Sequence, residues 1–376
     1  MSNIPKLLLS LSGETITTKE MWEQFRRKEV MHLLSEYVYG VRDIERPDNL
    51  FFKQKGETEF CGMRRKDIEC GFGSFSFPFS LYLPKAQEGP FPVFVYSLIE
   101  GHEDTYHFNG NGNFVHKEHA DYCMPAKNIT NRGYAVAVMP TRGIYRDWEA
   151  HAEFKQGVFA AVKTAKKRQG HAWASISAWA WGMSRVIDYL ETDRDIDTRH
   201  IAAVGHSRGG KTALWAGATD ERIELTVSNN SGCMGAAILR GKRGEHAKEI
   251  NISDWFCENF KAYNDHEEML PVDQHMLLAA IAPRYLYVTS SSEDTWADPD
   301  KEYLACQMAS EVYGLYGLQG VVCPNEKPSL DTAYTEGHIA YHNKTGEHSI
   351  TYYDWDRFMN FFDKIIQNAG QSKTIL

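Results

Sequence analysis

The pentapeptide Gly205-His206-Ser207-Arg208-Gly209 decides the fold of this chain. It follows an apolar run at residues 201–204 and opens a helical segment at residues 211–217. A serine between two glycines at a strand-to-helix junction is typical of a nucleophile elbow, whose tight turn lifts the hydroxyl clear of the sheet. Only glycine tolerates the crowding two residues before and two after that serine. A phosphate-binding loop is the alternative, but it needs a longer glycine spacing before its lysine.

Apolar runs and helical patterns alternate on both sides of this junction. We expect strands at residues 68–84, 91–96, 134–138, 201–204, 223–227 and 284–288, and helices at 18–38, 172–190, 276–281 and 354–366. Such alternation indicates a mostly parallel sheet with helices on both faces. With the elbow, it predicts an α/β-hydrolase fold, a three-layer sandwich. We expect residues 1–376 to form a single domain, with residues 1–70 as an N-terminal helical extension packed on it.

Composition narrows the class of protein. The net charge is −9 and the pI is near 5.9, which disfavours nucleic acid or an anionic membrane as partner. The seven cysteines are scattered without a Cys-x-x-Cys pair, which favours free thiols. The N-terminal apolar patch, residues 7–11, is too short for a signal-peptide core, so the chain as given reads as cytoplasmic. No helical histidine pair suggests a metal, and we expect no cofactor. The oligomeric state is not predicted.

A serine hydroxyl needs a base, and the base needs an acid to hold its tautomer. In an α/β-hydrolase the chain order is serine, acid, histidine. The strand that ends at Val288 runs into a polar loop with three carboxylates, where sites of open α/β sheets gather. We choose Asp294 as the acid, because a residue several positions past the strand can fold back under the site. Glu293 and Asp298 are the alternatives, and a solvated acidic loop is the non-functional interpretation.

Three histidines follow this loop in the sequence. His348 lies in a polar turn before the last helix, where this fold delivers its base, so we predict it as the base. His338 and His342 occupy a less defined segment and are the alternatives. His206 adjoins the serine, but an elbow turns successive side chains in different directions, which makes it either a packing residue or one that supports a catalytic side chain from behind.

Two cations close to the serine are unusual for an elbow. Arg208 would place a charge near the forming oxyanion while its backbone N–H donates to the same oxygen, and a second N–H would come from residues 98–101. An ion pair that orders the loop is the other interpretation of Arg208. Lys211 is either a substrate-binding residue or a solvated lysine on the helix face.

From about residue 200 to 300 the chain resembles the glucuronoyl esterases of carbohydrate esterase family 15, especially the bacterial members. The matching stretches are Gly205–Lys211, Asn230–Gly235, Asp254–Phe256, Leu270–Met276, Ile281–Arg284 and Trp296–Pro299. Their order and spacing are more specific than the elbow alone. The first 90 residues carry little of the resemblance.

The resemblance implies cleavage of the ester between a 4-O-methyl-glucuronic acid side group of xylan and a lignin alcohol, without metal or organic cofactor. It implies that Ser207 is the nucleophile and His348 the base, that Arg208 supports the oxyanion and that Lys211 binds sugar hydroxyls. Trp296 aligns with a tryptophan that, in the family, contacts the uronate. Glu245 resembles a family glutamate near the sugar.

One departure concerns the acid. Fungal members carry it where this chain has Asn230, and an amide supplies no charge. The acid must therefore come from the later loop, as in some bacterial members, where Asp294 stands. The partner is a small-molecule or oligosaccharide ester. The alternatives are an acetyl xylan esterase-like carbohydrate deacetylase and a carbohydrate-binding relative without turnover.

Overall fold

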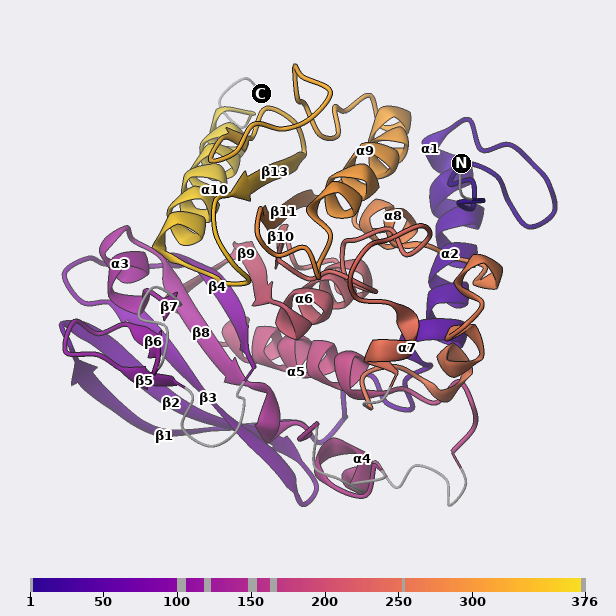
Figure 1. The fold of residues 1–376 in the computed structure, drawn as a ribbon. Coiled ribbons are helices and arrows are strands. Elements are labelled where there is room, and N and C mark those ends of the chain that lie inside the picture. The colour runs from indigo at the N-terminus through magenta and orange to yellow at the C-terminus, as the bar shows by residue number, and fades with distance from the viewer. Residues whose placement is uncertain are drawn as a thin grey trace.

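The computed structural model describes residues 3–99, 106–117, 123–147, 154–162, 168–251 and 254–372. A twisted sheet of ten strands runs through these residues (Figure 1). In the order in which they lie side by side, the strands are β1 (Phe51–Phe60), β2 (Met63–Phe72), β3 (Phe75–Pro84), β8 (Ala135–Pro140), β4 (Phe91–Leu98), β9 (Ile196–His206), β10 (Leu225–Asn229), β11 (Tyr285–Ser291), β13 (Ile339–Lys344) and β12 (Ala333–Tyr334). The run from β8 to β13 is parallel, and both edges are antiparallel.

Helices cover both faces of the sheet (Figure 1). One face carries α3 (Ala126–Asn131) and α10 (Tyr352–Ser372), and the other carries α5 (Ser175–Leu190), α6 (Arg208–Thr219), α8 (Gln274–Ala279) and α9 (Pro299–Leu315). Strand β9 feeds both cores, since Ile201 and Ala203 pack under the second set of helices while Ala202 and Val204 pack under the first. Alternate side chains of a strand point to opposite faces, so a strand buried on both faces is continuously apolar.

Smaller elements complete the described residues. A three-stranded sheet contains β5 (Tyr106–Phe108), β6 (Phe114–His116) and β7 (Cys123–Met124), and the short helices are α4 (Gly157–Ala161), α7 (Ala247–Ile250) and the 3-10 turns Thr141–Gly143, Glu258–Tyr263 and Glu267–Met269.

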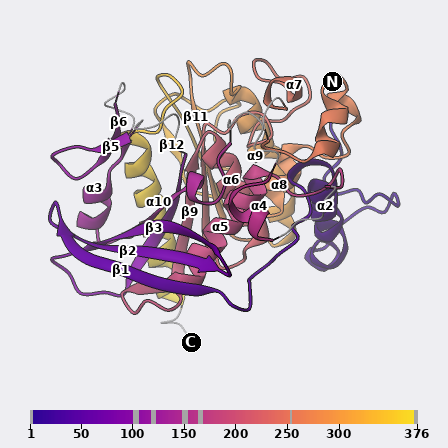
Figure 2. The ribbon, with the colours of Figure 1, turned by 90° about the horizontal axis from the view of Figure 1, so that it is seen from below.

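The N-terminal helix begins at Lys19, is capped by the side chain of Thr18 and ends at Tyr39. It consists of α1 (Lys19–Met21), α2 (Arg27–Leu34) and two π-helical stretches, Trp22–Arg26 and Ser35–Tyr39. Figure 2 shows it at the opposite side of the molecule from β1–β3. The guanidinium of Arg27 ties it to the body, because it donates to the carbonyls of Ala280 and Ala218, each at 3.0 Å.

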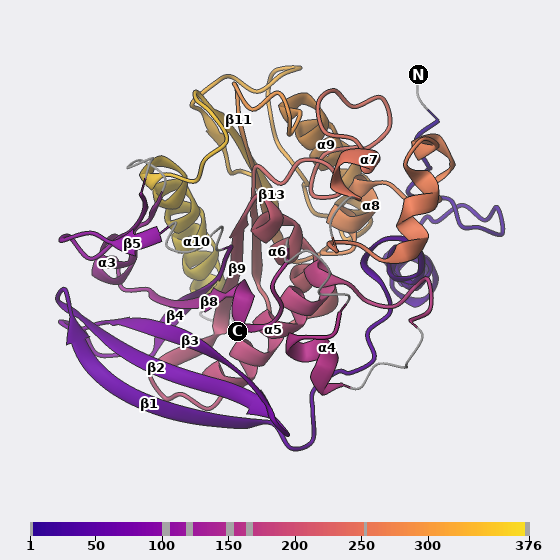
Figure 3. The ribbon, with the colours of Figure 1, turned by 60° about the horizontal axis from the view of Figure 1, so that its bottom comes forward.

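The predicted strands and helices are confirmed, with boundaries that move by a few residues. The helical extension over residues 1–70 is wrong in its second half, because β1 and β2 lie there and lengthen the sheet at its antiparallel edge (Figure 3). The burial of β1 explains the error. Its residues alternate only between exposed and half-buried, so the strand offers no apolar pattern.

Candidate active site

Ser207 lies at the corner between β9 and α6, with φ 55° and ψ −120°. A non-glycine residue in such a conformation costs about 1–3 kcal/mol and persists only where its surroundings fix it. Here its backbone N–H donates to the carbonyl of Asn229 at 2.9 Å. A Cβ on Gly205 would lie 1.9 Å from the Gly209 carbonyl oxygen, and one on Gly209 would lie 2.9 Å from Ser97 Oγ. The crowding expected on both sides of the serine is therefore present.

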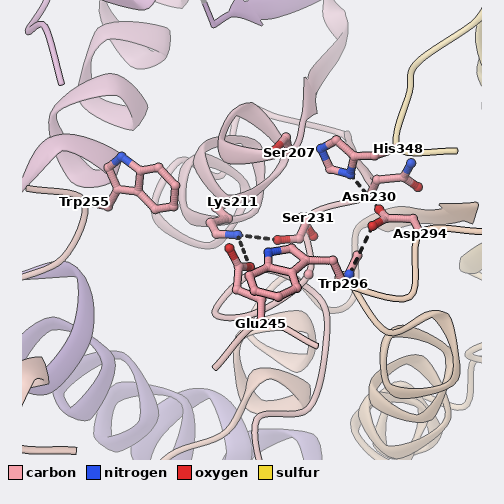
Figure 4. Close-up of a pocket in the computed structure, with 11 residues that line it drawn as sticks. Ser207, Lys211, Asn230, Ser231, Glu245, Trp255, Asp294, Trp296 and His348 are labelled. Atoms are coloured by element: carbon pink, nitrogen blue, oxygen red, sulfur yellow. Dashed lines mark hydrogen bonds and ion pairs between the residues drawn. The ribbon is translucent and has the colours of Figure 1, made fainter. Parts of the chain in front are cut away.

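The sheet brings Asp294 and His348 to the same edge as this corner. Asp294 follows the end of β11, and His348 lies in the loop between β13 and α10. His348 Nδ1 is 2.6 Å from Asp294 Oδ2. The imidazole is 43% exposed and the carboxylate 3%. Figure 4 shows the ring of His348 between Ser207 and Asp294, with its second nitrogen toward the serine.

The alternative acids and bases lie elsewhere. Glu293 is exposed, and its backbone N–H bonds to Gly346. Asp298 caps α9. His338 stacks on Tyr285 with ring centroids 4.6 Å apart, and His342 is fully buried in a pair with Asp354.

A cavity of about 290 Å³ opens over Ser207 (Figure 4). It is lined by Ser207, Lys211, Asn230, Ser231, Gly232, Glu245, Trp255, Asp294, Trp296, Ala297 and His348. The volume is at the small end of ligand pockets, which usually measure about 300–1,000 Å³. It accommodates a single sugar-sized group beside the serine.

The side of the cavity away from His348 is polar. Lys211 lies on α6, one turn after the serine, and its Nζ donates to the carbonyl of Ser231 at 2.6 Å and pairs with Glu245 at 3.7 Å. The lysine is only 3% exposed, so the solvated helix-face interpretation is wrong. Trp296 is 54% exposed at the rim, and its carbonyl accepts from Glu245 N at 3.0 Å and Lys242 Nζ at 2.7 Å.

The side chain of Arg208 forms the ion pair of the second interpretation, and its support of the oxyanion stays a prediction. Its guanidinium forms an ion pair with Asp147 and lies over the ring of Trp255, 5.2 Å from the centroid. Trp255 Nε1 donates to the same Asp147 carboxylate at 2.9 Å. The side chain thus orders the cavity wall, while the backbone N–H of Arg208 opens α6, where the first N–H groups lack helical acceptors. The second donor was expected at residues 98–101, of which 100 and 101 lie outside the described residues.

Asn230, where the resemblance places the acid of fungal members, does not contact the base in the described hydrogen-bond network. Its backbone is left-handed, with φ 46°. Its Nδ2 donates to Ser291 Oγ at 2.8 Å and to the carbonyl of Ser349 at 3.3 Å. The amide therefore braces the residue next to His348, and the histidine takes its carboxylate partner from Asp294.

Sequence reasoning missed Glu302, a fully buried carboxylate beneath the cavity floor. It accepts from Gly232 N at 2.9 Å and from Ser290 Oγ at 2.6 Å, and it fixes the turn that lines the cavity. Burial raises its pKa to about 7, against the lowering effect of these two hydrogen bonds. The available signal was a glutamate on the apolar stripe of α9, one turn before Cys306. Asp147 carries no comparable signal in the sequence.

Among the described residues, no cluster of three or more His, Cys, Asp and Glu side chains could hold a metal ion. No helix in the described ranges is long and apolar enough to span a bilayer.

A strained serine between strand and helix, with an acid and then a histidine following it in the chain, defines an α/β-hydrolase. The comparisons with known proteins narrow this class. The family model "Glucuronyl esterase, fungi" matches residues 127–317. A carbohydrate esterase of an unknown prokaryotic organism is 35% identical over 96% of this chain and 89% of its own length. The chain belongs to the glucuronoyl esterases of carbohydrate esterase family 15, which are carboxylic ester hydrolases.

Two further relatives agree with this placement. The glucuronoyl esterase from Solibacter usitatus superposes with a TM-score of 0.85 at 32% identity, covering 96% of this chain and 97% of that one. A 4-O-methyl-glucuronoyl methylesterase from Hypocrea jecorina is 31% identical over 84% of this chain and 63% of its own length. The similarity reaches well beyond residues 200–300, where the sequence motifs lie.

Proposed function

We propose that this protein hydrolyses esters in which a 4-O-methyl-glucuronic acid supplies the acyl group, by a Ser207–His348–Asp294 mechanism. The observation that carries the proposal is the 2.6 Å contact between His348 Nδ1 and Asp294 Oδ2 at the wall of a cavity that also contains Ser207. The name of the Hypocrea jecorina relative supports the choice of substrate.

In the proposed mechanism, the Ser207 hydroxyl gives its proton to His348 Nε2 as its oxygen attacks the ester carbonyl. Asp294 accepts the Nδ1 proton in a hydrogen bond and stabilises the imidazolium that forms. The tetrahedral oxyanion takes a hydrogen bond from the backbone N–H of Arg208. The alcohol then leaves with the proton from His348. Water, deprotonated by the same ring, cleaves the acyl-enzyme and releases the uronic acid.

The polar side of the cavity suits the uronoyl ring. An ammonium has three donors, and Lys211 donates one of them to the carbonyl of Ser231 at 2.6 Å. Its contact with Glu245 is an ion pair at 3.7 Å, so a further N–H can donate to a sugar hydroxyl. The carboxylate of Glu245 offers an acceptor beside it, and the exposed indole of Trp296 offers an apolar face at the rim. Donor, acceptor and ring thus surround one sugar.

The test is a comparison of two esters on the purified protein. We expect methanol release from methyl 4-O-methyl-glucuronate to exceed acetate release from acetylated xylose, because Lys211, Glu245 and Trp296 then contact the acyl sugar. Acetate release that is far faster would replace the proposal with a carbohydrate deacetylase.

Ser207→Ala is the matched control for both esters. It should abolish turnover and leave the melting temperature within a few degrees of wild type. A wild-type protein that hydrolyses neither ester and does not react with a serine-directed phosphonate would be a binding protein on this fold.

A further inference from the structure

The ring of His206 packs against the ring of His348. Their centroids are 4.5 Å apart and the ring planes are inclined by 55°. His206 ends β9, one residue before the serine, and is 5% exposed. On one side, the ring of His348 therefore meets a second imidazole.

The orientation of His206 is fixed by a chain of side chains behind it. Asn229 Nδ2 donates to Thr289 Oγ1 at 2.5 Å and lies 3.4 Å from Asp354 Oδ1. A carboxylate accepts only, so the amide nitrogen faces it and the amide oxygen faces away. That oxygen lies 2.5 Å from His206 Nδ1. Nδ1 of His206 must therefore carry the proton.

The surroundings of His206 also keep its ring neutral. Burial lowers the pKa of His206 well below its ordinary value, and the neighbouring His348 and Lys344 lower it further. Asn229 and Asp354 act in the opposite direction and do not overcome these effects. A neutral ring matters here because His348 becomes a cation during the proposed reaction, and a second cation beside it would oppose that step.

We propose that His206 is a positioning residue for His348, a neutral ring in a fixed tautomer that sets the plane of the general base. The proposal rests on the proposed function. Asp294 bonds to one nitrogen only, which fixes an atom of the ring but not its plane. His348 is 43% exposed, so the loop around it restrains the ring on few sides. The contact with His206 supplies the missing restraint and keeps Nε2 directed at Ser207.

Two substitutions separate the ring from its hydrogen bond. His206→Gln keeps an amide that can bond to Asn229 but removes the ring face, and His206→Phe keeps a ring face but cannot bond. Misplacement of a catalytic group by about 1 Å costs about 100-fold, so we expect His206→Gln to lower kcat about 30-fold with KM within about twofold. His206→Phe should lower kcat about threefold and act mainly on the melting temperature, because it leaves Asn229 Oδ1 without its donor.

His338→Gln is the matched control. It removes a histidine ring that stacks on Tyr285, with ring centroids 4.6 Å apart, and that does not line the cavity. It should leave kcat unchanged. Equal losses of kcat in His206→Gln and His206→Phe, or full activity of His206→Gln, would overturn the proposal.

A second measurement does not need turnover. Long-range ¹H–¹⁵N spectra of histidine-labelled protein, assigned with His206→Phe, should show His206 as the neutral Nδ1–H tautomer across pH 5–9. Titration of His206 within that range, or the Nε2–H tautomer, contradicts the proposal. A wild-type protein without esterase activity ends the proposed function instead, and the spectra still report on the tautomer.

Discussion

The molecule contains two His–Asp pairs of similar geometry in very different surroundings. His348 and Asp294 approach to 2.6 Å, and His342 and Asp354 approach to 2.9 Å. The first histidine is 43% exposed beside a cavity, whereas the second is 0% exposed. His342 Nδ1 is also 3.0 Å from the hydroxyl of Tyr287, so both of its nitrogens have partners.

The charges around the two pairs differ as well. Asp354 bonds to Lys344 and to the backbone N–H of Thr351 at the start of α10. Burial alone would raise the pKa of Asp354, but the bond from His342 and the charge of Lys344 hold it far below its usual range. Burial lowers the pKa of His342. A His–Asp contact is therefore a structural tie where both partners are enclosed, and a candidate site only where one nitrogen faces a cavity.

The largest difference is expected between His348→Gln and His342→Gln. Loss of a triad histidine costs about 10⁵–10⁶ in kcat, so His348→Gln should abolish turnover with little change in melting temperature. His342→Gln should leave kcat within about threefold and lower the free energy of unfolding by about 1–3 kcal/mol, the cost of a buried charged hydrogen bond. Ester kinetics and thermal melts measure both. Similar kinetics for the two variants would contradict the assignment of one His–Asp pair to catalysis and the other to stability.

The two neighbouring carboxylates of one loop, Asp294 and Glu293, should also differ: only the one that contacts the base should affect turnover. Replacement of a triad aspartate by asparagine costs about 10⁴ in kcat, because the wrong tautomer of the base is favoured. We expect this loss for Asp294→Asn and little change for Glu293→Gln, whose side chain is exposed. Steady-state turnover of one small uronate ester measures it. The reverse pattern would assign the acid to Glu293.

Asp354→Asn should affect stability more than chemistry. It leaves the buried Lys344 ammonium without its counter-charge, and breaking a buried ion pair costs about 3–5 kcal/mol. Chemical denaturation should show this loss. Asp356→Asn on the exposed face of the same helix is the control and should change the unfolding free energy little. A stable Asp354→Asn protein would mean that the pair contributes nothing to the fold.

Glu302 tests what happens to a buried carboxylate that forms no ion pair among the described residues. Its folded pKa of about 7 lies above the ordinary value of 4.5, so folding takes up a proton between these values. The free energy of unfolding should fall as pH rises from 4.5 to 7 and stay low above it. Glu302→Gln should remove this fall and raise the free energy of unfolding at pH 8 by at most about 3.5 kcal/mol, at about 1.4 kcal/mol per pKa unit.

Glu311→Gln, on the exposed side of the same helix, is the control for this measurement and should keep the wild-type pH dependence. Melting temperatures from pH 4 to 8 provide the comparison. An unchanged pH dependence in Glu302→Gln would place the titration elsewhere.

The sequence predicts those parts of the molecule whose physics is local. The crowding around Ser207 requires glycines at fixed spacing, and strand order places Asp294 and His348 without any knowledge of distances. The choice of His348 over His342 rests on the polar turn before the last helix. The structure places His342 within β13, a strand that the sequence pattern does not predict.

The remaining features depend on contacts between distant segments. Asp147 meets Arg208 from 61 positions away, and no local pattern encodes that pairing. Glu302 lies one turn before Cys306 on the buried side of α9, but only the packing of α9 on the sheet shows that its carboxylate is enclosed. Strand β1 pairs through its backbone while its side chains stay largely exposed. Hydrophobic periodicity therefore does not predict a strand there.

The position of the N-terminal helix has a consequence for the order in which the protein folds during synthesis. Arg27 reaches a carbonyl 253 positions later in the chain. At about 5–20 residues per second, a ribosome needs about 13–50 s to synthesise that span. Throughout this interval the apolar stripe of Val30 and Leu34, fully covered in the finished protein, has no docking surface. This helix leaves the ribosome well before the residues it packs against and is thus among the last to settle, so its apolar stripe must be shielded until the body has formed.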